Sequence, residues 1–238
     1  MTDTEAPNAE AARIEAVKAD VIDAALPHVA FDGWSDATLA EAVRDAGVDP
    51  GLARMAFPRG GVDLALAYHW AMDAELTERI ATEDMSTLRY SEKVARCIEL
   101  RFELIADDRE AVRRAAAMFA LPIHARDGAR AIWHTADTIW TALGDTADDV
   151  NWYTKRATLS GVYSSCVLYW LGDESPDMAA TRGFIARRID DVMSFERVKA
   201  AVRNNPLGRA LMAGPDKVLG RVRAPGAGRD DMPGRWRR

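Results

Sequence analysis

The chain has 238 residues, which is enough for one large helical domain or two small ones, and its 48% hydrophobic content is ample for a buried core. Apolar runs such as residues 166–171 are far shorter than the roughly 18 to 20 residues that cross a bilayer, which excludes a membrane-spanning protein. The two cysteines, Cys97 and Cys166, lack metal-like or redox-like spacing and are expected to be reduced core thiols.

Charge is distributed unevenly along the chain. Residues 197–238 carry a net charge of about +8, and the remainder carries about −14. The basic end is expected to be attracted to anionic lipid or nucleic acid, whereas the acidic body is repelled by phosphate. Residues 1–10 are acidic and lack both an apolar signal core and the Arg-rich pattern of a transit peptide. These features predict a bacterial cytoplasmic protein, peripheral on the inner membrane.

Helical spacing of apolar residues predicts four helices in the first third of the chain. They cover residues 14–26, 35–46, a short stretch from 49, and 61–81. Their ends are marked by capping and helix-ending residues: Pro27 with Gly33, Ser35, Gly47, Asp49-Pro50 and Gly60-Gly61. This order of a helix, two short helices and a long helix resembles the helix-turn-helix layout of TetR-like repressors.

Five further helices are predicted over residues 91–105, 109–119, 125–143, 150–171 and 176–195. No window has the period-two alternation of a strand, so the expected fold is all-α, a TetR-like bundle of about nine or ten helices. The expected organisation is a disordered N-terminus (1–10), a helix-turn-helix-like part (11–82), a helical part (83–196), and a basic amphipathic segment with a disordered tail (197–238).

The helix predicted to begin near residue 150 has two large aromatic residues in its first turn. Asp149 or Asn151 can cap this turn, and residues 157–171 are nearly apolar on all sides, which predicts a central, buried helix. Because Trp152 and Tyr153 precede the apolar part, at least one ring is expected to face outward as an interface anchor. The alternative is a hydrophobic staple that only fixes the entry to the helix.

An ordered series of residues resembles the ninth COQ protein family, lipid-binding accessory factors of ubiquinone biosynthesis. The resemblance covers roughly residues 13–199. It rests on His28-Val29, Gly33-Trp34, Gly60-Gly61, Leu121-Pro122, Trp140, Gly144-Asp145, the run from Asn151 to Ala157, Tyr163, Ser175-Pro176-Asp177, Thr181, Phe184, Arg188, Asp191 and Met193.

This resemblance implies a TetR-like bundle that opens a hydrophobic cavity between its C-terminal helices, usually as a homodimer. The implied ligand is a prenylated quinone intermediate or another isoprenoid lipid, and the implied partner is the demethoxyubiquinone hydroxylase, a membrane-bound di-iron enzyme. The family's Asn-Trp-Tyr motif is intact. It implies a surface for the hydroxylase formed by Asp149, Asn151, Trp152 and Tyr153, with Ile139 on the preceding helix.

Two further surfaces are expected near the C-terminus. An apolar stripe on the helix 176–195 is the expected dimer interface, although the same stripe could face the core: Phe184, Ile185, Ile189, Val192 and Met193. An amphipathic segment over residues 198–222, interrupted by Pro215, is expected to bind anionic membrane through Leu207, Arg209, Leu211, Met212, Lys217, Leu219 and Arg221.

Catalytic and metal-binding patterns are missing from the sequence. The Glu-x-x-His pair of a di-iron bundle does not occur at any of the four histidines, and there is no phosphate-binding glycine loop or Gly-x-Ser-x-Gly elbow. No cofactor or metal is therefore expected. An enzyme acting on a small substrate is the third and weakest interpretation.

A DNA-binding TetR-like regulator is the principal alternative to a lipid-binding protein. The recognition stretch would be residues 48–55, which offers one cation, Arg54, one anion, Asp49, and otherwise small or apolar groups. Contacts to DNA phosphate need several Lys, Arg, Ser or Thr donors. The sequence therefore predicts a repressor scaffold without a DNA-binding face, and no nucleic-acid partner.

Overall fold

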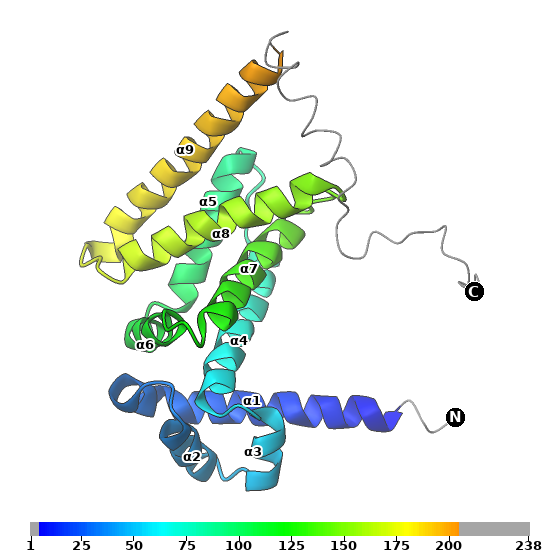
Figure 1. Ribbon diagram of the computed structural model, residues 1–238, viewed down its shortest axis with the longest axis vertical. Helices are drawn as coiled ribbons and strands as arrows, with labels where there is room; N and C mark the ends of the chain where they lie inside the picture. Colours follow the sequence, from blue (N-terminus) through cyan, green and yellow to red (C-terminus); the bar gives the residue numbers. More distant parts are fainter. Residues whose placement is uncertain (1–4, 205–238) are drawn as a thin grey trace.

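The computed structural model describes residues 5–204, and every regular element within that range is a helix (Figure 1). The all-α prediction is confirmed. The elements are α1 (Glu5–Asp32), α2 (Asp36–Asp45), α3 (Pro50–Ala56), α4 (Gly61–Thr82), α5 (Tyr90–Leu104), α6 (Arg109–Phe119), α7 (Ala125–Ala142), α8 (Val150–Trp170), the 3-10 helix η1 (Pro176–Met178) and α9 (Ala179–Asn204).

The first three helices form one end of the molecule, with α1 packed against both α2 and α3 (Figure 1). Ser35 caps α2, as predicted, by accepting a hydrogen bond of 3.1 Å from the backbone N–H of Thr38. Gly60 has φ +65°, and a Cβ there would lie 1.9 Å from the Asp36 carboxylate. The chain therefore needs glycine where α4 begins beside α2.

Helix α1 is longer than predicted at both ends. It begins at Glu5, within the stretch expected to be disordered, and it continues through Pro27 to Asp32. Pro27 removes one backbone hydrogen bond, but it lies on an exposed face where water can satisfy the freed carbonyl. Ala25 and Val29, both fully buried, hold the helix on either side of it. Gly33, with φ +67°, ends the helix.

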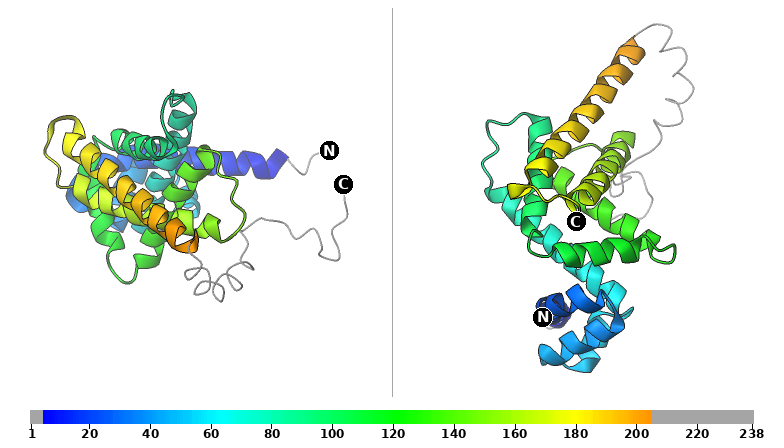
Figure 2. Two further views of the ribbon diagram at one scale, coloured as in Figure 1. Left: turned by 90° about the horizontal axis from the view of Figure 1, so that it is seen from above. Right: turned by 90° about the vertical axis from the view of Figure 1, so that its left-hand side faces the viewer.

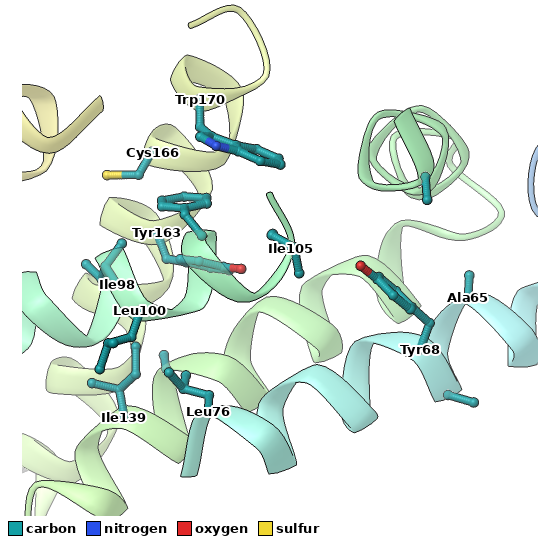
Figure 3. Packing of buried hydrophobic residues seen from close by; sticks show 14 of the residues in the cluster. Ala65, Tyr68, Leu76, Ile98, Leu100, Ile105, Ile139, Tyr163, Cys166 and Trp170 are labelled. Carbon is teal, nitrogen blue, oxygen red and sulfur yellow. The ribbon is translucent and has the colours of Figure 1, made fainter. Parts of the chain in front are cut away.

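Helix α4 links this end to the bundle formed by α5 to α9, and it packs against α5 and α7 (Figure 1). Side chains from three helices meet in the core, where Leu76, Leu100 and Ile139 lie close together (Figure 3). Phe102 of α5 stacks on both Tyr163 and Trp170 of α8, with ring centroids 5.8 and 5.3 Å apart. Most of the large buried side chains therefore pack where α4, α5, α7 and α8 meet, and their burial stabilises the bundle.

Helix α8 is buried on one face only, so the prediction of a central, buried helix is correct for that face and wrong for the opposite one. Leu159, Tyr163, Cys166 and Trp170 are buried, whereas Leu168 on the opposite face is 70% exposed. The residues between them are small, hydroxyl-bearing or aromatic. Their hydropathy does not distinguish a core face from an apolar surface, because both need uncharged side chains.

Helix α9 begins three residues later than predicted, since Asp177 and Met178 have positive φ and form the turn before it. The buried Asp173 carboxylate holds this turn by accepting hydrogen bonds from the backbone N–H groups of Ser175 (2.8 Å) and Thr181 (2.9 Å). Burial opposes ionisation of Asp173, but these hydrogen bonds outweigh it and keep its pKa low.

At its other end α9 runs to Asn204, across the boundary expected at residue 196, and projects beyond the rest of the bundle (Figure 2). None of the described helices is long and apolar enough to span a bilayer. The residues predicted to contact membrane lie outside the described part of the chain: Leu207, Arg209, Leu211, Met212, Lys217, Leu219 and Arg221.

Candidate functional site

Three aromatic rings gather where α7 passes the start of α8, and we call them the aromatic cluster: Trp133, Trp152 and Tyr153. The Trp152 and Tyr153 rings meet edge to face with centroids 4.8 Å apart. Trp133 lies 5.9 Å from Trp152 and 6.5 Å from Tyr153. All three side chains are half-buried, so each has one packed side and one accessible side.

Arg156 packs against the buried side of the Trp152 ring and holds it in place. The guanidinium carbon of Arg156 lies 4.0 Å from the centroid of the Trp152 ring. The same group donates from Nε to Asp137 (2.5 Å) and from Nη1 to Asp145 (3.0 Å). Arg156 is 2% exposed, so a buried cation whose charge is balanced by two carboxylates supports the ring.

The start of α8 does not contain a hydrophobic staple. A staple pairs an apolar residue before the cap with one in the first turn, and here the residue before the cap is Asp148. Asp149 is the cap, as predicted, and accepts from the backbone N–H of Asn151 at 2.8 Å. Tyr153 instead packs against Trp133 of α7. The rings therefore contribute to the surface between α7 and α8.

The residues predicted to form the partner surface are only partly brought together. Asn151 is exposed and Asp149 is half-buried, beside the aromatic cluster. Ile139 is fully buried and points into the core with Leu76 and Leu100 (Figure 3). The prediction that Ile139 belongs to the docking surface is therefore wrong, because this residue lies on the face of α7 that packs against α4.

A groove between α5, α7, α8 and α9 lies next to the start of α8, and we call it the apolar groove. It encloses about 290 Å³ and is lined mainly by Val94, Trp140, Thr158, Leu159, Val162 and Ile189. Asn151 and Lys155 lie at its polar end. Tyr90 stacks on Trp140 with centroids 5.9 Å apart, and the Trp140 indole N–H has no hydrogen-bond partner among the described residues.

The stripe predicted as a dimer interface is used largely within the protomer. Ile185 and Ile189 are buried, while Val192 and Met193 line the apolar groove. Phe184 stacks on Tyr169 of α8, with centroids 4.3 Å apart and ring planes inclined by 8°. The alternative that this stripe faces the core is correct for Ile185 and Ile189, because α9 packs on both α5 and α8.

Trp133 and Tyr90 were not identified as site residues by the sequence analysis. The signal for Trp133 is its place on α7, because consecutive helices joined by a short loop usually pack together, so an aromatic residue of α7 can meet the start of α8. Tyr90 gives no such signal, because its contact with Trp140 depends on how α5 packs in three dimensions.

The described residues contain no cluster of three or more His, Cys, Asp or Glu side chains arranged to hold a metal ion. Burial raises the pKa of the Cys97 thiol to about 12 and that of the Cys166 thiol to about 11, so both stay protonated. On α3, Arg54 is the one basic residue, and Arg44 on α2 is paired with Glu41. The geometry favours binding of apolar and aromatic groups.

Residues 125–196 match the COQ9 family model. The chain is similar to "Ubiquinone biosynthesis protein COQ9, mitochondrial" of Xenopus tropicalis, with 31% identity over 76% of this chain and 59% of the relative. It is also similar to the proteins of that name in Drosophila melanogaster (27% identity, 79% and 59% covered) and Homo sapiens (27% identity, 82% and 62% covered). The chain thus spans about three fifths of the length of these relatives.

Among solved structures, the chain is similar to the TetR transcriptional regulator from Nitrosomonas europaea ATCC 19718. The TM-score is 0.58 at 19% identity, with 73% of this chain and 96% of the regulator covered. At this identity the likeness shows the fold alone, and it confirms the TetR-like architecture.

The comparisons correct the predicted location. The prediction of a bacterial cytoplasmic protein at the inner membrane is wrong by this comparison, because these relatives are named as mitochondrial proteins and come from eukaryotes. It rested on the acidic first residues of a chain that spans only part of its relatives, and such a start carries no conclusion about targeting.

Proposed function

The chain belongs to the COQ9 family, and we propose that it is a non-catalytic protein of ubiquinone biosynthesis that binds prenylated quinone intermediates and presents them to the demethoxyubiquinone hydroxylase. The observation that carries the proposal is the adjacency of two features on the first turns of α8. Asn151 and Lys155 close the polar end of the apolar groove, and Trp152 and Tyr153 lie between them in sequence as part of the aromatic cluster.

The apolar groove has the chemistry of a site for part of an isoprenoid lipid. Its walls are aliphatic side chains from three helices, and burying apolar lipid surface against them contributes about 25 cal/mol per Å². This offsets part of the cost of drawing a chain out of the bilayer. A volume of about 290 Å³ lies at the lower end of ligand pockets, so the groove holds a segment of such a lipid.

The polar end of the apolar groove suits the ring of a quinone intermediate. Trp140 supplies an indole N–H without a partner among the described residues, and Lys155, whose ammonium is 2.5 Å from Asp145, lies 5.5 Å from the Trp140 ring. A quinone oxygen can accept from the indole N–H while the isoprenoid tail follows the apolar wall. A head group held here lies at the same end of α8 as the aromatic cluster.

The aromatic cluster has the properties of a docking surface for the hydroxylase. Half-exposed tryptophan and tyrosine rings on a rigid support are the residues that most often dominate binding energy at protein interfaces. The support is the ion-pair set of Arg156 with Asp137 and Asp145. A surface fixed in advance loses little side-chain freedom on binding.

A homodimer is a further part of the proposal. Leu168 and Tyr169 are 70% and 38% exposed on α8. These side chains leave an apolar surface on α8 that a second copy could cover. The buried isoleucines of the predicted stripe are not part of this surface.

The proposal is tested by extracting lipid from the purified protein and by native mass spectrometry of the intact protein. A retained prenylquinone or isoprenoid is expected. Thr158→Trp should remove it, since Thr158 is exposed on α8 and lines the apolar groove, so a larger ring enters the groove without disturbing the core.

Ala157→Trp is the matched control, because Ala157 is also exposed on α8 but does not line the apolar groove. It should retain lipid as the unmodified protein does. Equal lipid content in the two tryptophan variants would place the lipid elsewhere. Prenyl lipid missing from every preparation, including protein expressed with the full biosynthetic machinery, would contradict the proposal.

A further inference from the structure

A second cavity lies inside the bundle, on the other side of α8 from the apolar groove, and we call it the inner cavity. It encloses about 260 Å³ between α4, α5, α6, α7 and α8. Its apolar wall includes Ile105, Val112, Ala116 and Val167. Leu168, 70% exposed, also lines it, so the cavity reaches the surface at α8.

The inner cavity differs from the apolar groove because its deep wall contains a buried cation. Arg101 is 1% exposed, and its Nε donates to the Asp73 carboxylate at 2.9 Å. Its Nη1 is enclosed but makes no hydrogen bond within the described residues. An unused N–H of a buried guanidinium is costly, so a cavity wall that contains one favours a ligand with an acceptor.

Other polar groups in this wall are already engaged. The Tyr68 hydroxyl donates to Asp108 at 2.9 Å, and Nε2 of His69 lies 2.9 Å from both the Ala131 carbonyl and the Thr135 hydroxyl. The hydroxyls of Tyr68 and Tyr163 point toward one another across Ile105 (Figure 3). Arg101 is therefore the donor with capacity left for a ligand.

The charge around Arg101 is already balanced. Asp73 stays ionised, because its contacts with His134 and Arg101 outweigh burial and lower its pKa. Burial lowers the pKa of His69 to about 4, so this imidazole is neutral near pH 7. A ligand with a full negative charge would leave a net charge buried, whereas a neutral acceptor would not.

We propose that the inner cavity is a second ligand site that binds a neutral, ring-sized molecule bearing a carbonyl oxygen, with that oxygen accepting a hydrogen bond from Nη1 of Arg101. The cavity is large enough, since an engineered apolar cavity of about 150 Å³ binds benzene in another protein. The site is separate from the apolar groove, because the two are lined by different faces of α8.

The test compares three probes of one size in NMR titrations of the full chain: acetophenone, ethylbenzene and benzoate. Acetophenone should bind about tenfold more tightly than ethylbenzene, which lacks the carbonyl, because a hydrogen bond to a charged donor contributes at least that factor. Benzoate should bind more weakly than acetophenone, since it adds a charge. Equal binding of acetophenone and ethylbenzene, or stronger binding of benzoate, would overturn the proposal.

Two variants on α6 locate the site. Ala116→Phe should abolish acetophenone binding, because Ala116 lines the inner cavity, whereas Ala117→Phe, one residue along and exposed, should not change it. Arg101→Lys keeps the charge beside Asp73 but removes Nη1, and it should bring the ratio of acetophenone to ethylbenzene affinity close to one. If Arg101→Lys does not fold, the alanine pair decides, and unchanged binding in Ala116→Phe refutes the site.

Discussion

The guanidinium of Arg156 lies over the ring of Trp152, with its central carbon 4.0 Å from the ring centroid. Through its ion pairs the same group connects α8 to α7. The ring belongs to the surface of α8, and the carboxylates of Asp137 and Asp145 that neutralise the cation come from α7 and the turn after it. The aromatic cluster is thus an extension of the core, and changes below the surface should alter it.

Arg156→Met should lower the free energy of unfolding by about 3 to 5 kcal/mol, because it leaves the buried Asp145 carboxylate with Lys155 as its one remaining cation. Denaturant unfolding measures this. Arg126→Met, an exposed arginine of α7, is the control and should stay within about 0.5 kcal/mol of the parent. A loss below about 1 kcal/mol in Arg156→Met would show that the ion pairs are not structural.

Acid should destabilise the protein through His69. Its pKa is lowered to about 4 in the folded state, mainly by burial, from its ordinary value of 6.5. Above pH 6.5 the imidazole is neutral in both states. As the pH falls from 6.5 to 4 the unfolded state alone takes up a proton, which lowers the free energy of unfolding by about 3 kcal/mol. The free energy of unfolding should therefore change much less with pH across this window in His69→Gln than in the parent. The same pH dependence in both proteins would contradict the assignment.

The predicted homodimer is tested by the mass of the protein in solution. Sedimentation at micromolar concentration should give the mass of two chains. Leu168→Glu should shift it toward one chain, because a charge would enter the apolar face of α8, whereas Arg54→Glu, on α3 at the other end of the molecule (Figure 1), should not. A single-chain mass for the unmodified protein would remove the dimer from the account.

The basic end of the chain should bind anionic vesicles. Removing residues 205–238, which leaves α9 intact, should abolish flotation with them, and added salt should weaken it since charge is screened over about 8 Å at physiological ionic strength. Leu207→Glu with Leu211→Glu separates insertion from charge attraction, because it abolishes binding only where apolar side chains enter the lipid. Equal flotation of the shortened and full chains would defeat the membrane prediction.

Much of the fold could be predicted because its local signals agree with its packing. The bounds of α6 were predicted to the residue, and Ser35 and Asp49 cap α2 and α3 as expected, since capping is a contact between near neighbours. Pro27 is the exception. Its local signal ends a helix, but the burial of its neighbours continues α1 past it.

The site was less predictable, because the side of a helix that a residue faces depends on distant partners. Trp152 was identified from its position at a helix start, but Ile139 was assigned to the same surface and lies in the core. The unused N–H of Arg101 could not be predicted either, since it depends on how α4 and α5 cross.

The central claim is that the aromatic cluster binds the hydroxylase, and the affinity of the hydroxylase for Trp152→Ala and Tyr153→Ala tests it most directly. Each change removes a central aromatic anchor and should cost at least about 2 kcal/mol, or roughly thirtyfold in affinity. The melting temperature should change by only a few degrees. Phe31→Ala, which removes an 81% exposed aromatic ring of α1, is the control and should bind as the parent does.

Two results would contradict the account. Unchanged affinity in both variants would show that the hydroxylase docks elsewhere. Loss of folding in both would show that the rings serve the stability of the start of α8, as a staple would. The account predicts a weakened complex between folded proteins, with Phe31→Ala unaffected.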